Sequence, residues 1–81
     1  MNRLEMLKWM YEHCQNRDNA KYHTIVKNVI GDNFYKELDK MGFLNSEYIV
    51  TDRYVWLSYL GNEYCKLIFN HDSRRTTKIG Y

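Results

Sequence analysis

The chain has 81 residues, of which 44% are hydrophobic and 16% aromatic, and its formal net charge is +2. This length allows one small domain, and the apolar content excludes a wholly disordered chain. Two cysteines and three histidines are scattered along it, so we expect reduced thiols and no metal or cofactor. No apolar run is long enough for a signal peptide or a membrane-spanning helix, which predicts a cytoplasmic protein with no membrane partner.

The first predicted element is a helix over residues 2–15. Its apolar residues recur at spacings of three and four, which places them on one face: Leu4, Leu7, Tyr11 and Cys14. Trp9 lies roughly 160° from the centre of that face. It is either a rim residue that packs on a neighbouring loop or an anchor for a second subunit or partner. The polar segment 16–20 ends the helix.

Two short helices follow, joined by a single glycine. The first spans residues 21–30, and Asp32, after Gly31, is the expected N-cap of the second. The second spans residues 33–41. Its expected core residues are Phe34, Leu38 and Met41, with Tyr35 at the edge. The tight joint predicts a helix-turn-helix arrangement.

A hairpin and a last helix complete the predicted domain. Strand-like runs over residues 46–51 and 54–57 are separated by the polar pair at 52–53, which predicts a two-stranded hairpin. Ser58 is placed to cap a helix over residues 59–70. The expected inner face of this helix is Leu60, Tyr64, Leu67 and Ile68. Cys65 and Phe69 lie off that face, which indicates that something packs against them from outside.

The fold class is therefore α+β and mostly helical, with three helices, a two-stranded β-hairpin and a C-terminal helix. Residues 38–44 (LDKMGFL) resemble the end of the recognition helix of winged-helix domains. Residues 55–64 (VWLSYLGNEY) resemble the exit from the wing of that family into its last helix. The resemblance covers residues 3–69 and is to small bacterial and phage regulators of the MarR-like and PadR-like kind. It implies a winged-helix domain over residues 1–70. Residues 71–81 have no apolar periodicity and are expected to form a basic, flexible C-terminal tail.

The resemblance implies double-stranded DNA as the partner, read by a recognition helix over 32–41 and a wing over 46–57. Asn33, Lys36 and Lys40 would face the major groove, with Tyr35 at its margin. The preceding helix would supply contacts to the DNA backbone from Lys21, His23, Thr24 and Lys27. Arg53 at the wing tip would enter the minor groove or meet a phosphate. Salt-sensitive contacts would come from the tail cations Arg74, Arg75 and Lys78.

A protein-interaction module with the same fold, of the kind that phages or plasmids use to block a host protein, is the alternative. Residues 1–69 are electrically balanced, with nine cations and nine carboxylates, and tyrosine is abundant. Either reading is compatible with a homodimer, for which we expect Trp9, Cys65 and Phe69 near the interface. Catalysis is not expected, because the sequence offers no nucleophile beside a base and no glycine-rich phosphate loop.

Overall fold

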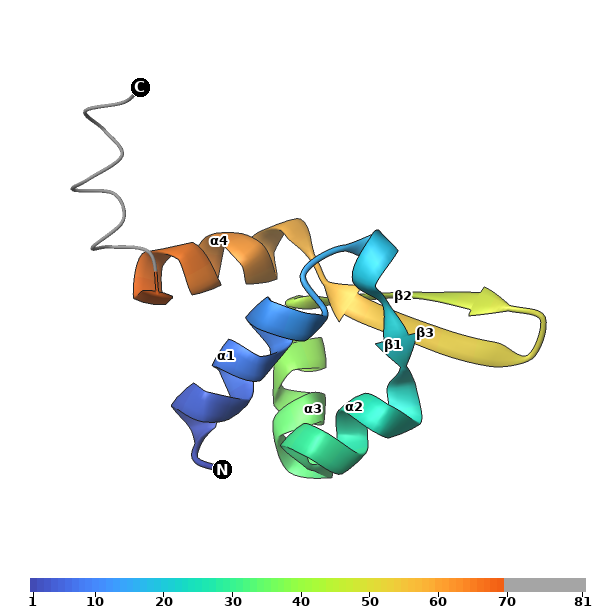
Figure 1. Cartoon of the computed structure of the whole chain (residues 1–81), viewed down its shortest axis with the longest axis horizontal. Coiled ribbons are helices and arrows are strands. Elements are labelled where there is room, and N and C mark those ends of the chain that lie inside the picture. Colours follow the sequence, from blue (N-terminus) through green and yellow to red (C-terminus); the bar gives the residue numbers. More distant parts are fainter. Residues whose placement is uncertain (70–81) are drawn as a thin grey trace, which may run out of the picture.

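The computed structural model describes residues 1–69 and has an α+β, mostly helical fold, as predicted (Figure 1). Within this part of the chain there are four α-helices and three strands, of which β1 is separated from the β2–β3 hairpin by two helices. The elements are α1 (Arg3–His13), the short 3-10 helix η1 (Arg17–Asn19), β1 (Lys21–Tyr22), α2 (His23–Ile30), α3 (Asp32–Lys40), β2 (Leu44–Ile49), β3 (Asp52–Leu57) and α4 (Tyr59–Phe69).

The first helix begins at a capping box. The Asn2 side chain accepts a hydrogen bond from the Glu5 backbone at 2.8 Å, and the Glu5 carboxylate accepts one from the Asn2 backbone at 2.9 Å. Further along α1, Leu7 and Met10 are buried, and Cys14 at its end is also buried. Leu4, which we expected on the core face, is exposed instead.

The joint between α2 and α3 is as short as predicted, although its capping differs. Gly31 has φ of 85°, a conformation that favours glycine, and it is both the C-cap of α2 and the N-cap of α3. Asp32 is therefore not the N-cap. It lies in the first turn of α3, where its carboxylate still interacts favourably with the positive end of the helix dipole.

The sheet has three antiparallel strands in the order β1-β3-β2, so the two-stranded prediction was incomplete. Residues 21–22, which we assigned to the start of a helix, pair with β3 instead. The hairpin turn also differs, because Ile49 pairs with Asp52 and leaves Val50 and Thr51 as the turn. Valine has a high propensity for strands, but the cross-strand register places Val50 in the turn. The hairpin projects beyond the helices (Figure 1).

The connection from β3 into α4 is fixed by a serine and a glycine. The Ser58 hydroxyl donates to the Gly42 carbonyl at 2.7 Å and accepts from the Gly61 backbone at 3.0 Å, which confirms Ser58 as a cap. A Cβ added to Gly61 would lie 2.5 Å from the Phe43 carbonyl oxygen. The glycine therefore allows two backbones to approach closely.

This close approach decides which face of α4 is buried, and the predicted inner face was wrong. Gly61 and Cys65 face the core, and Cys65 has an exposed fraction of 0%. Three of the residues that we placed inside are exposed, Leu60 by 53%, Tyr64 by 42% and Leu67 by 69%. They recur at spacings of four and three, so α4 presents a continuous apolar stripe on its outer side.

Candidate nucleic-acid interface

The outer face of α3 carries the three side chains that were predicted to read DNA. Asn33, Lys36 and Lys40 are exposed and lie on the side of the helix opposite the buried Phe34 and Leu38. At 100° per residue they fall within an arc of about 60°. No carboxylate of the helix falls inside this arc, so amide and ammonium donors are presented together.

Tyr35 does not belong to this exposed face. Only 3% of it is exposed, so its predicted place at the helix edge was wrong. The Lys27 ammonium lies 5.1 Å from the centre of its ring, in a cation–π contact between α2 and α3. The buried hydroxyl has no hydrogen-bond partner. Burial raises the pKa of Tyr35 above its ordinary value, and the nearby Arg53 partly offsets this.

Arg53 lies inside β3, opposite Tyr48, so its predicted place at the hairpin tip was wrong. It is half-buried, and its Nε has no hydrogen-bond partner. Its carbonyl oxygen lies 3.3 Å from His23 Nδ1, a contact that holds the start of α2 against β3. Arg53 is thus near Tyr35 and Lys27 at the junction of α2, α3 and the hairpin.

The remaining predicted contacts lie on or before α2. Thr24 is exposed, while Lys21 is half-buried in β1 and donates to the Asn19 carbonyl at 3.5 Å. The structure therefore divides the predicted residues into two groups. The α3 stripe is Asn33, Lys36 and Lys40, and the junction of α2, α3 and the hairpin includes Lys27 and Arg53. The tail residues lie outside the described part of the chain: Arg74, Arg75 and Lys78.

The cations that were predicted to bind DNA differ from three other cations of the described chain in their ion pairing. Across residues 1–69 there are three ion pairs: Arg3–Glu37, Arg17–Glu47 and Lys66–Glu63. None involves a cation that was predicted to bind DNA. The cations left without a carboxylate partner in the described chain include all five predicted ones: Lys21, Lys27, Lys36, Lys40 and Arg53. Lys8 on α1 is the sixth. The junction and the α3 stripe are therefore available to an anionic ligand.

The structure contradicts one of the three residues that were predicted near a partner interface, and the interface itself stays a prediction. Cys65 is in the core, Phe69 is half-buried and stacks on Tyr11 with ring centres 5.9 Å apart, and Trp9 is half-buried against the core.

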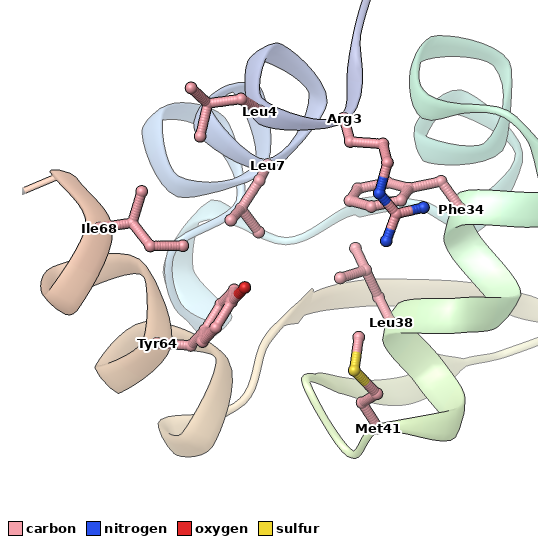
Figure 2. Close-up of a pocket in the computed structure, with 8 residues that line it drawn as sticks. All are labelled: Arg3, Leu4, Leu7, Phe34, Leu38, Met41, Tyr64 and Ile68. Atoms are coloured by element: carbon pink, nitrogen blue, oxygen red, sulfur yellow. The ribbon is translucent and has the colours of Figure 1, made fainter.

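An apolar groove that was not predicted from the sequence lies between α1, α3 and α4 (Figure 2). Figure 2 shows Tyr64 and Ile68 of α4 facing Met41 and the other residues across an open space. Its volume is about 240 Å³, and it is lined by Arg3, Leu4, Leu7, Phe34, Leu38, Met41, Tyr64 and Ile68.

Both cysteines of the described residues are free and buried. Burial raises the pKa of the Cys14 thiol to about 11 and that of the Cys65 thiol to about 12, so both are protonated near neutral pH. No group of three histidine, cysteine or acidic side chains within residues 1–69 could hold a metal ion. In the same part of the chain, every helix is too short or too polar to cross a membrane.

Comparisons with models of protein families, with curated proteins and with solved structures found no match.

Proposed function

We propose that the chain is a cytoplasmic winged-helix protein that binds double-stranded DNA, with α3 in the major groove and the β2–β3 hairpin as its wing. The observation that carries the proposal is the distribution of unpaired cations. Those of α2, α3 and β3 have no carboxylate partner in the described chain, and neither has Lys8 on α1, whereas Arg3, Arg17 and Lys66 are paired. Cations without carboxylate partners attract a polyanion, even on a nearly neutral body.

The two groups of residues would make different contacts with DNA, the α3 stripe with the bases and the junction with the backbone. Asn33 on the outer face of α3 can form paired hydrogen bonds with adenine, and Lys36 and Lys40 can donate to guanine or to phosphates. Lys27 and Arg53, at the junction beside α3, are placed to meet the sugar-phosphate backbone. If all five predicted cations of the described chain contact phosphates, the affinity should fall roughly 10²- to 10³-fold between 50 and 200 mM salt.

Fluorescence anisotropy with a random-sequence duplex at these two salt concentrations tests the proposal. We expect binding that weakens steeply with salt, and further weakening in the Lys36→Ala/Lys40→Ala variant. The matched control is Lys8→Ala/Lys66→Ala, which removes the same charge from α1 and α4. Equal losses of DNA affinity in both variants would show that binding depends on net charge alone and not on the α3 stripe. Absence of binding at 50 mM salt would overturn the proposal.

The apolar groove supports a second candidate function, a protein-interaction module. Its rim and the outer stripe of α4 expose large apolar side chains: Leu4, Met41, Leu60, Tyr64 and Leu67. Such a cluster on a small domain marks an interface. We propose that a second copy of the chain covers it, and that a host protein is the other possible occupant.

The dimer proposal is tested by sedimentation equilibrium. Wild-type protein should self-associate at tens of micromolar, and Leu60→Glu/Leu67→Glu should be a monomer, because both changes place carboxylates on the exposed stripe of α4. A wild-type monomer at that concentration would contradict a homodimer. The groove would then be tested against host proteins.

A further inference from the structure

The sheet has an aromatic face that plays no part in the proposed DNA contacts. Val55 and Leu57 of β3 point into the core, so the alternating residues Tyr54 and Trp56 point to the opposite side. Tyr22 of β1 pairs with Tyr54 in register, and the two rings stack with centres 4.7 Å apart and planes 27° apart. Three aromatic side chains thus lie on one side of two adjacent strands.

A groove of about 340 Å³ runs over this face. Its floor comes from the strands and one wall from η1 and the residue after it. It is lined by Arg17, Asp18, Ala20, Glu47, Ile49, Tyr54 and Trp56. The Trp56 indole N–H has no acceptor among residues 1–69, so it is a donor available to a ligand. Two aromatic residues and one free donor within a groove are typical of a binding surface.

The charge around the groove selects the class of ligand. Both carboxylate oxygens of Glu47 accept from the Arg17 guanidinium, at 2.6 and 2.7 Å. Asp18 in the wall and Asp52 beyond Ile49 have no cation within ion-pairing distance in the described chain. The surroundings are therefore net negative. Phosphates would be repelled, which favours a basic peptide over a single-stranded nucleic acid stacked on the aromatic rings.

We propose that this groove binds a proline-rich peptide segment in the polyproline II conformation, with an arginine or lysine beside its prolines. Such a segment has no internal hydrogen bonds, and its proline rings dock on aromatic surfaces. Tyr54 and Trp56 are two residues apart on one side of β3, so their rings form one aromatic surface on which proline rings of the peptide can dock.

The polar groups complete the arrangement. The Trp56 indole N–H donates to a peptide carbonyl. Proline has a backbone carbonyl but no N–H, so a proline-rich segment has more carbonyl acceptors than N–H donors. Asp18 pairs with the cation of the peptide. The site lies on the side of the sheet opposite the core, so peptide binding and duplex binding use different side chains and can fail separately.

The test is a titration of ¹⁵N-labelled full-length protein, followed by NMR. The probe is a peptide of two arginines followed by ten prolines. We expect saturable shifts of Tyr22, Tyr54 and the Trp56 indole N–H, with a Kd on the order of 100 µM. Two controls are a peptide of two arginines followed by glycine-serine repeats, and a single-stranded thymidine 15-mer.

Two variants locate the site. Trp56→Leu should weaken peptide binding at least tenfold and leave duplex affinity unchanged. Asp18→Lys, an exposed change outside the core, should weaken it about threefold to tenfold by reversing the charge of the wall. Its matched control is Glu12→Lys on α1, which should have little effect. Asp18→Lys also decides the matter if Trp56→Leu does not fold.

Several results would overturn the proposal. These are absence of shifts with the proline peptide, equal binding of the glycine-serine peptide, or binding of the thymidine strand at these residues. Concentration-dependent shifts of the same residues without peptide would show that a second copy of the chain occupies the groove instead.

Discussion

Arg3 of α1 forms two parallel hydrogen bonds with the Glu37 carboxylate of α3, one of them at 2.9 Å from Nη1 to Oε2. The same guanidinium lies 5.1 Å from the centre of the Phe34 ring. The hydrogen bond from Arg3 lowers the pKa of Glu37 below its ordinary value. The stability that this pair contributes is therefore present above the ordinary carboxylate pKa and is lost as the pH falls through the lowered value. Because Glu37 flanks the exposed stripe of α3, Arg3 also cancels a negative charge beside the proposed DNA site.

The first prediction concerns this cancellation. Arg3→Gln should weaken duplex binding, because Glu37 is then unneutralised, and Glu37→Gln should strengthen it by freeing a cation. We expect changes of roughly threefold to tenfold in opposite directions at 50 mM salt. Anisotropy measures both, and the double variant should be close to wild type. Changes in the same direction would show that the pair acts through the fold rather than through charge.

The second prediction concerns Gly61. Gly61→Ala should lower the free energy of unfolding by about 2–4 kcal/mol, because the new methyl group would collide with the Phe43 carbonyl and a backbone must shift. Urea denaturation measures this. Lys66→Ala on an exposed side of the same helix, away from the apolar stripe, serves as the control and should change stability by less than about 0.5 kcal/mol. A small loss at Gly61 would mean that α4 moves away at little cost.

The third prediction concerns the hairpin turn. Val50 has φ of 59°, which is strained for a β-branched residue, and it is 91% exposed, so its side chain contributes little burial. Val50→Gly should therefore raise the free energy of unfolding by about 0.5–1 kcal/mol. Thermal unfolding measures the change. Thr51→Gly, where φ is not positive, should instead lower stability, and stabilisation by both changes would contradict the argument from φ.

The fourth prediction concerns alkaline pH. Burial raises the pKa of Cys14 to about 11 and of Cys65 to about 12. Between the ordinary thiol pKa and these values, the folded state binds more protons than the unfolded state, so stability should fall as the pH rises above about 9.

Urea midpoints at pH 7, 9 and 10 measure the alkaline loss. Cys65→Ala should reduce its slope, even though the variant is less stable at pH 7. In the folded protein both thiols should also resist alkylation at pH 8. Rapid alkylation under native conditions would show that they are not buried in solution.

The sequence predicted the local elements well, but it predicted less well which face of each helix is buried. The α3 stripe of Asn33, Lys36 and Lys40 was predictable because buried Phe34 and Leu38 define the opposite side of one regular helix. The buried face of α4 was not, because Leu60, Tyr64 and Leu67 form a better apolar stripe than Gly61 and Cys65. The orientation of α4 was decided instead by the contact between Gly61 and the Phe43 carbonyl, residues that are far apart in sequence.

The sheet shows the same limit. Lys21 and Tyr22 have no strand signal of their own, and only pairing with Val55 and Tyr54 makes them β1. The apolar groove and the aromatic groove were missed for the same reason, since each combines side chains from elements that are separated in sequence.

The Ser58 hydroxyl, which joins the Gly42 carbonyl to the Gly61 amide, has a mechanical consequence. Gly42 lies two residues beyond the end of α3, and Gly61 is in the first turn of α4. We expect a displacement of α4 by a molecule seated in the apolar groove to be transmitted to the C-terminal end of α3, where Lys40 lies, through this hydroxyl and through the hydrogen bond from the Ser58 backbone to the Phe43 carbonyl. If the two positions of α4 differ in their affinity for that molecule, occupancy of the groove and affinity for DNA are coupled, and the coupling has the same size in both directions.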